Sequence, residues 1–183
     1  MAPVMERASD VAIVPVGPSD AADLAHVHVK AWRETYRGLL PQAYLDHMSL
    51  DAHARRFHAR LEHPADNHVT LGAEARSGLV GYCEGHAWAS PFGGEAEIHT
   101  LYVLRAAQGE GVGRRLMQDA VRVFRDAGAS GLIVWCLAAN VKARGFYERM
   151  GGTAAARRAG RGPGGRVNAV AYGWSSLEPL LAA

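Results

Sequence analysis

The spacing of apolar residues changes along this chain from the period of a helix to the period of a strand and back, and this succession limits the possible folds. Apolar side chains recur every three or four residues over 24–39 and again over 50–61, which predicts two amphipathic helices, the first capped by Ser19. A short apolar strand at 11–16 precedes them. The period is then two in three further segments, which predicts strands with a turn at 91–94 before the last: 68–75, 79–88 and 96–103.

The second half of the chain alternates between helix and strand. Helical spacing returns over 112–127, and an almost wholly apolar run at 132–137 predicts a strand buried on both faces. A short helix is expected at 140–150, followed by strands at 153–159 and 167–174. The Arg- and Gly-rich stretch 157–166 is interpreted as the loop between those strands. We therefore predict an α/β fold, with a mixed, mostly antiparallel sheet that helices flank and a central helix crosses.

Length and charge indicate one domain and exclude several classes of protein. The 183 residues are 49% hydrophobic and 21% charged, which suits one globular domain over 1–183, with 1–9 expected to be a flexible tail. No apolar run approaches the roughly 18–20 residues of a membrane span, so we expect a cytoplasmic protein without a membrane partner. A net charge of +2 gives no reason to expect a nucleic-acid partner. The only two cysteines, Cys83 and Cys136, form no CxxC motif and fit a reducing compartment.

A glycine-rich segment lies between the strand that ends in Leu101-Tyr102-Val103 and the following helix. Three alternating glycines, Gly109, Gly111 and Gly113, precede or begin the first helical turn. The free N–H groups and the dipole of a helix start can hold a phosphate, and a Cβ would keep the anion away from the backbone. The P-loop pattern fails because no Lys is nearby, and GxGxxG fails because Arg114 takes the place of its last glycine. A turn with a helix cap remains the structural alternative.

Two motifs together resemble the GNAT superfamily of acetyl-CoA-dependent N-acetyltransferases. The first is Gln108-x-x-Gly111-x-Gly113, and the second is Asn140-x-x-Ala143-x-x-x-Tyr147-Glu148-x-x-Gly151. The resemblance covers about 11–174 and implies a sheet splayed centrally at the acetyl-CoA site. Acetyl-CoA is then the co-substrate and an amine the acceptor, and a homodimer is possible. The cofactor-binding residues that the resemblance implies are Leu101, Val103, Gln108, Gly109, Glu110, Gly111, Val112, Gly113, Arg114 and Asn140.

The resemblance also suggests catalytic residues. Acetyl transfer needs a deprotonated amine and a proton for the departing thiolate, and the family's motif assigns the second task to Tyr147. Glu97 is the candidate base, with His99 or a chain of waters as alternatives. Family members that acetylate ribosomal proteins often carry a glutamate five residues before the Asn, where this chain has Trp135, so their mechanism is not carried over. A core tyrosine and a solvent-facing carboxylate are the structural alternatives for Tyr147 and Glu97.

Other reactive or charged groups receive weaker assignments. Cys136 is expected to be an inert buried thiol, and the histidines show no zinc spacing, so no metal is expected. Arg114, Arg115 and Arg144 are candidates for the CoA phosphates or for a solvated surface. The arginines of 157–166 either favour an acidic acceptor or lie in a solvated loop. The acceptor pocket is expected to draw on a set of aromatic and imidazole side chains: Trp32, Tyr36, Tyr82, His86, Trp88, His99 and Trp135.

Two other functions compete with catalysis. A catalytically silent acyl-CoA-binding module would keep the glycine loop without needing an acid and a base. A dinucleotide-binding domain is disfavoured by the failure of GxGxxG. The leading hypothesis is an N-acetyltransferase that acts by direct attack in a ternary complex on a small amine or an exposed peptide amine.

Overall fold

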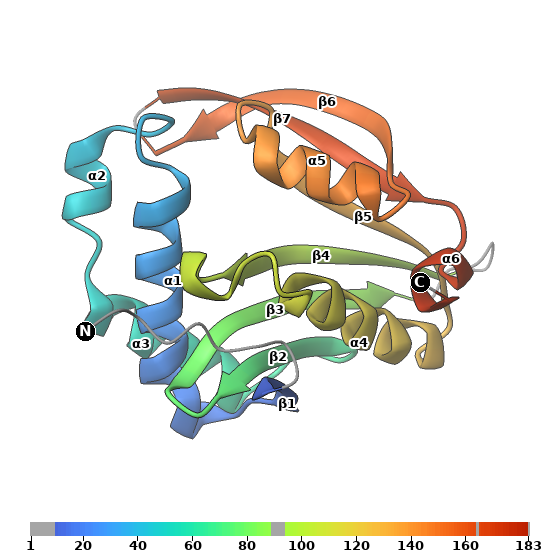
Figure 1. Ribbon diagram of the computed structural model, residues 1–183, viewed down its shortest axis with the longest axis horizontal. Helices are drawn as coiled ribbons and strands as arrows, with labels where there is room; N and C mark the ends of the chain where they lie inside the picture. The colour runs from blue at the N-terminus through green and yellow to red at the C-terminus, as the bar shows by residue number, and fades with distance from the viewer. Residues whose placement is uncertain (1–9, 89–93, 164, 183) are drawn as a thin grey trace.

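A seven-stranded sheet runs through the molecule in the order β1-β2-β3-β4-β5-β7-β6 (Figure 1). The computed structural model describes residues 10–88, 94–163 and 165–182. The expected tail at 1–9 and most of the expected turn at 91–94 lie outside these residues. The strands are β1 (Ala12–Pro15), β2 (His68–Ala75), β3 (Gly78–Trp88), β4 (Gly94–Val103), β5 (Ala129–Leu137), β6 (Thr153–Gly162) and β7 (Gly165–Trp174).

The strand directions confirm the predicted sheet. Neighbouring strands are antiparallel except β4 and β5, which are parallel, because a helix crosses between them. The helices are α1 (Ala21–Thr35), α2 (Gln42–Asp46), α3 (Leu50–Glu62), α4 (Val112–Asp126), α5 (Val141–Arg149) and α6 (Glu178–Ala182). Among the described residues, no helix combines the length and the apolar composition that crossing a membrane requires.

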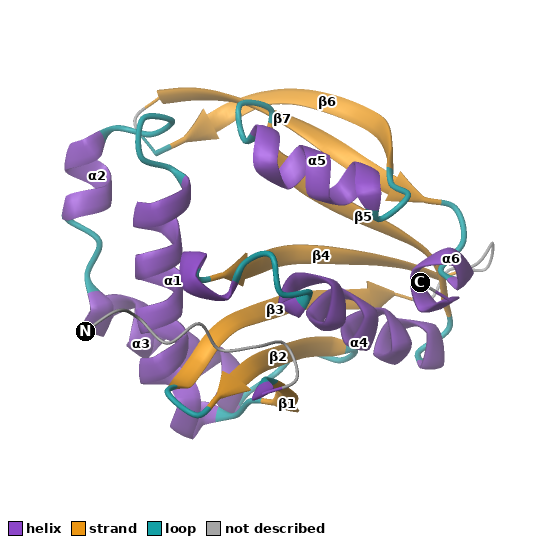
Figure 2. Cartoon of the chain, viewed as in Figure 1, coloured by secondary structure: helices purple, strands orange, loops and turns teal. Residues whose placement is uncertain are grey.

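The helices cover the two faces of the sheet separately (Figure 2). On one face, α4, α5 and α6 build the larger core, in which Leu116 and Phe124 of α4 are fully buried against strand residues such as Ile98. On the other face, α1 and α3 pack around Tyr82 of β3, with Leu24 at the centre of that smaller core. Each helix therefore buries the apolar stripe that its sequence spacing predicts.

The short helical elements were not predicted. Helices α2 and α6 have five residues each, too few for a periodic stripe to be recognisable. The expected cap at Ser19 is also wrong, because 18–20 form a 3-10 turn and Asp20 is the N-cap of α1. The carboxylate of Asp20 accepts a 2.8 Å hydrogen bond from the Gly17 amide, which closes that turn.

The Arg- and Gly-rich stretch is strand rather than loop. β6 extends through Arg161 to Gly162, and β7 begins at Gly165, so that Arg161 pairs with Arg166 near the tip of the hairpin. Arginine and glycine have no strong preference for strands, so this stretch carries no strand signal in its composition. Backbone hydrogen bonds with β7 hold this stretch as a strand instead. The regular alternation of a strand then places each arginine on a defined face.

The expected alternation of side chains along β4 is broken by a β-bulge. Glu84 of β3 pairs with Thr100 and Gly85 pairs with Ile98, so His99 is an extra residue on β4. Ile98 and Leu101, which alternation would place on opposite faces, both pack in the core beneath α4. Strict alternation over 96–103 would place Glu97 on the face of Leu101 and Val103, but the bulge puts them on opposite faces, because it shifts every later residue to the other face.

Candidate active site

The two central strands separate halfway along their length. β4 and β5 pair from Gly94 with Ala129 only as far as Ile98 with Val134. Beyond that pair, β4 stays bonded to β3 and β5 stays bonded to β7, while the two strands diverge (Figure 2). The inner edges of 99–103 and 135–137 therefore present backbone N–H and C=O groups to the gap. Such an edge can pair with an extended ligand as a further strand would.

The glycine-rich loop closes one end of this gap. Gly109 and Gly111 have φ angles of 86° and 78°, a conformation that L side chains rarely adopt, and Gly111 is the N-cap of α4. The side-chain amide of Gln108 donates a 2.8 Å hydrogen bond to the Val103 carbonyl. Gln108 thus fastens the loop to the end of β4 from within the protein.

The loop, the strand end and α5 meet at Gly113. A Cβ at this position would lie 3.7 Å from the ring of Phe146 and 3.7 Å from a methyl group of Val103. Val112 is buried beside them, so its backbone rather than its side chain is available to a ligand, and Leu101 packs against the same core. The structure therefore brings the two sequence motifs to opposite sides of one gap. The residues of this cradle fit a phosphate-bearing ligand, because two positive-φ glycines and the start of α4 leave backbone N–H groups uncovered.

The three arginines considered for phosphate binding differ in their surroundings. Arg114 is exposed in the first turn of α4, four residues after the partly exposed Glu110. Arg115 instead donates a 2.7 Å hydrogen bond to the Val11 carbonyl. Arg144 donates to the Tyr172 hydroxyl at 3.2 Å and to the Ala138 carbonyl at 3.4 Å. Of the three, Arg114 is placed best to meet an anion at the loop.

Tyr147 lies on α5, facing the core beneath α4. It is 6% exposed, with the rings of Phe146 and Tyr172 centred 5.3 and 5.8 Å away. Burial raises the pKa of its hydroxyl, and the nearby thiols of Cys136 and Cys83 raise it further. The hydroxyl is consequently protonated at neutral pH, the state that a proton donor needs.

Asn140 is the N-cap of α5 and is buried. Its side-chain oxygen accepts a 3.1 Å hydrogen bond from the Ala143 amide. The contacts of Asn140 are thus those of a helix cap. Among the residues that the structure describes, no group of three or more His, Cys, Asp or Glu side chains is arranged to hold a metal ion.

A cleft of about 590 Å³ opens on the other side of the gap, between α1, β4, β5 and the β6–β7 hairpin. Four of the expected aromatic and imidazole groups line it, together with Tyr102, which the sequence did not single out: Trp32, Tyr36, His99 and Trp135. Tyr82 does not reach the cleft, because it is fully buried under α1. Aromatic rings and one imidazole thus form part of the lining, beside aliphatic side chains, Glu97 and two arginines.

Two tyrosine hydroxyls meet in this cleft. Those of Tyr36 and Tyr102 lie 2.9 Å apart, within hydrogen-bond distance. Burial raises the pKa of both hydroxyls. Tyr36 also raises the pKa of Tyr147, and Tyr147 raises the pKa of Tyr102. The cleft and the buried hydroxyl on α5 are thus close neighbours across the gap.

Glu97 lines the same cleft and belongs to a row of titratable side chains. Its carboxylate lies 3.4 Å from Nδ1 of His99, and Nε2 of His99 lies 2.6 Å from Nδ1 of His86. The His86 ring also stacks near Trp88, with centroids 4.8 Å apart. Partial burial lowers the pKa of His86, and the neighbouring imidazole of His99 lowers it further. These contacts form a path for protons from the cleft toward the exposed end of β3 at Trp88.

Cys136 was expected to be buried in the core, but it is half-buried and lines the cleft. Desolvation raises its pKa to about 11, although Arg144 acts in the opposite direction. The thiol is therefore protonated at neutral pH and is a poor nucleophile. Cys136 is thus expected to be unreactive because its thiol stays protonated, and not because the thiol is inaccessible.

Comparison with known proteins agrees with this geometry. Residues 28–152 match the acetyltransferase (GNAT) family. The chain is 25% identical to the uncharacterized N-acetyltransferase YuaI of Bacillus subtilis over 162 residues, which cover 88% of this chain and 91% of the relative.

Solved structures show the same fold. The PaiA N-acetyltransferase of Thermoplasma acidophilum, in complex with coenzyme A, superposes with a TM-score of 0.67 at 20% identity over 87% of this chain and 97% of its own. A putative acetyltransferase of Salmonella typhimurium, YncA, with its cofactor acetyl-CoA, gives 0.66 at 19% identity over 90% and 92%. The matched family, the splayed sheet and the glycine loop agree, and this chain belongs to the acetyltransferase (GNAT) family as an acetyl-CoA-dependent acyltransferase.

Proposed function

We propose that the protein transfers the acetyl group of acetyl-CoA to a primary amine by direct attack, with both substrates bound where β4 and β5 separate. One observation carries this proposal. Glu97 lines the cleft on one side of the gap, while the Tyr147 hydroxyl lies buried on the other. Tyr36 and Cys136 line the cleft and also act electrostatically on Tyr147. A base and an acid thus flank one point in the structure.

The residues of the chain divide the proton transfers between them. Acetyl-CoA supplies a thioester carbonyl as the electrophile. Glu97 accepts the proton that an ammonium acceptor must lose, and His99 and His86 pass it to solvent. The neutral nitrogen attacks the carbonyl carbon and a C–N bond forms. The nitrogen then loses its second proton by way of Glu97 to solvent, and the C–S bond breaks. Tyr147 donates its proton to the departing sulfur and is reprotonated from solvent.

The state of Cys136 supports direct attack over an acetyl-enzyme. A thiol with a pKa of about 11 is almost wholly protonated at neutral pH, and the imidazoles nearest to the cleft already contact each other and Glu97. Covalent catalysis needs an activated nucleophile. Intact-protein mass spectrometry after mixing with acetyl-CoA alone should therefore show no added acetyl group on Cys136.

The acceptor class follows from the cleft. Its aromatic walls suit a small amine or the exposed amine of a peptide. We also infer a cytoplasmic location, which the unpaired thiols of Cys83 and Cys136 support.

The test is incubation of the protein with acetyl-CoA and a panel of amines, amino acids and peptides, following release of free CoA and the mass of the product. We expect at least one acceptor to gain an acetyl group, in the wild type and in Cys136→Ala alike. Acetyl-CoA that binds without turnover across the panel would contradict the enzyme and favour the silent binding module.

A further inference from the structure

The wall of the cleft opposite Glu97 carries a positive charge in a defined position. Arg158 of β6 places its guanidinium carbon 4.1 Å from the centroid of the Trp135 ring on β5. Both residues line the cleft. Stacking on an aromatic face leaves the N–H groups at the edge of a guanidinium free to bind an anion.

The register of the sheet explains how the Arg158 side chain on β6 reaches the Trp135 ring on β5, across β7. Trp135 pairs with Ala171 of β7, and Arg158 pairs with Ala169, two residues away on the same strand. Ala169 lines the cleft and Ala171 is fully buried, and because both side chains are small, neither separates β6 from the Trp135 ring. The Arg158 side chain is exposed but lies over the Trp135 ring beside these small residues.

The same register fixes the separation from Glu97. Glu97 pairs with Ile133, two residues before Trp135 on β5. One strand spacing of about 5 Å and two residues of about 7 Å put the Cα atoms of Glu97 and Trp135 roughly 9 Å apart, and the Arg158 guanidinium lies over the ring of that Trp135. An α-amino acid with one hydrogen bond at each end spans about 8 Å, which suits a ligand placed between two groups that line the same cleft.

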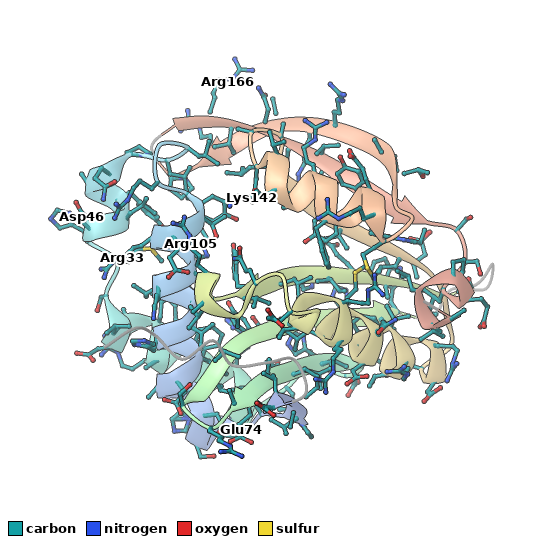
Figure 3. All side chains as sticks on the ribbon, in the orientation of Figure 1. Arg33, Asp46, Glu74, Arg105, Lys142 and Arg166 are labelled. Atoms are coloured by element: carbon teal, nitrogen blue, oxygen red, sulfur yellow. The ribbon has the colours of Figure 1, made fainter. Side chains whose placement is uncertain are left out.

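The charges of the cleft are matched to a zwitterion. Among the described residues, Glu97 is the one carboxylate lining the cleft, whereas two guanidinium groups, those of Arg158 and Arg161, line it. Within that part of the chain, no hydrogen bond or ion pair engages the Arg158 guanidinium. Arg166, by contrast, is exposed at the hairpin and points away from the molecule (Figure 3). A polyamine would meet repulsion at Arg158.

We propose that the acceptor is a small α-amino acid, whose carboxylate Arg158 binds while Glu97 receives the proton of its amine. This inference rests on the proposed acetyl transfer and adds the acceptor class to it. The aromatic side chains of Trp32, Tyr36 and Trp135 then contact the amino acid's side chain, which favours an apolar one.

The test compares acceptors that differ only in the anionic group. The twenty α-amino acids are offered as free acids and as primary amides, and kcat/KM is measured for wild type, Arg158→Gln and Arg157→Gln. Arg157 is the matched control, because alternation along β6 directs its side chain to the other face of the strand. We expect the best free acid to exceed its amide about 10-fold or more, and Arg158→Gln to remove about 10- to 100-fold of its kcat/KM. The amide should change by less than about 3-fold.

A binding measurement separates this inference from the proposed activity. Calorimetry of the best acid and its amide with the CoA-bound protein should show tighter binding of the acid, lost in Arg158→Gln and kept in Arg157→Gln. Preference for amides throughout, equal losses for acid and amide in Arg158→Gln, or no binding of any acid would overturn the inference. Acetylation of the amides in those cases would leave the proposed activity standing.

Discussion

Nδ1 of His86 and Nε2 of His99 lie 2.6 Å apart on neighbouring strands, although thirteen positions separate the two residues in the chain. The β-bulge on β4 produces this contact, because it makes His99 an extra residue beside the Glu97–His86 pair. The two imidazoles continue the row of titratable side chains that begins at the Glu97 carboxylate.

This contact predicts a change in pH dependence when His86 is replaced. The pKa of His86 is lowered from its ordinary value of 6.5 by partial burial and by His99, so His86 remains neutral and able to accept a proton until the pH falls below 6.5. In wild type, kcat/KM should therefore fall on the acid side. In His86→Phe the acid limb should change shape, while kcat/KM at pH 8 falls less than about 10-fold. A purely structural role would lower the rate equally at every pH.

Replacement of Tyr147 by Phe should slow the chemical step without weakening acetyl-CoA binding. We expect kcat to fall about 10²-fold, because the departing thiolate loses its proton donor, while the dissociation constant of acetyl-CoA changes less than about 2-fold. Burial raises the Tyr147 pKa above its ordinary value of 10.0, so this group should produce no alkaline limb below pH 10. Tyr44→Phe is the control, since Tyr44 is 41% exposed on α2. Equal kcat in the two variants would remove Tyr147 from the mechanism.

Gly111→Ala should weaken the acetyl-CoA site and the fold together. Gly111 has a φ of +78° with open space around it, so alanine suffers backbone strain of about 1 kcal/mol rather than a clash. Its methyl group also stands where a phosphate would approach the backbone. Calorimetry should show at least about 10-fold weaker acetyl-CoA binding, and urea unfolding should show the lost stability. Gly17→Ala, with a φ of −124° and open space, should change neither quantity.

His28 should make the protein less stable in acid. Its ring lies 2.6 Å from the Tyr82 hydroxyl, and burial, with His53 as the second cause, lowers its pKa from 6.5 to about 4. Between these values the unfolded chain binds more protons than the folded one, so the free energy of unfolding falls as pH falls from 6.5 to 4. Urea unfolding should show His28→Gln losing up to about 2 kcal/mol less than wild type over this window. The exposed His58→Gln should keep the wild-type slope; a wild-type slope in His28→Gln would contradict this account.

The sequence predicted the fold well where a side-chain period decides the structure. β2 has the predicted bounds, His68–Ala75, and α3 matches its stripe within a residue or two. The parallel pairing of β4 and β5 followed from the crossover helix α4, and the helix of the second motif lies beside the glycine loop, where Gly113 approaches the ring of Phe146.

The cleft was predicted less well, because its geometry depends on register. The bulge at His99 leaves no trace in the composition of β4, so the contact between His86 and His99 was missed. Arg158 was assigned to a loop because Arg and Gly give no strand signal, and its position over Trp135 depends on two alanines of a neighbouring strand. The small side chains of Ala169 and Ala171 leave room for Arg158 to reach Trp135, but this can be recognised only once the pairing of the strands is known.

The most direct test of acetyl transfer at this site is the rate of amine acetylation in Glu97→Gln, compared with Glu95→Gln. Both glutamates lie on β4, two residues apart, and Glu95 is exposed outside the cleft. With the best acceptor of the panel, we predict that Glu97→Gln loses about 10²- to 10³-fold in kcat at pH 7 while binding acetyl-CoA as wild type does. Glu95→Gln should retain wild-type kcat. Wild-type turnover in Glu97→Gln, or an equal loss in both variants, would contradict the account.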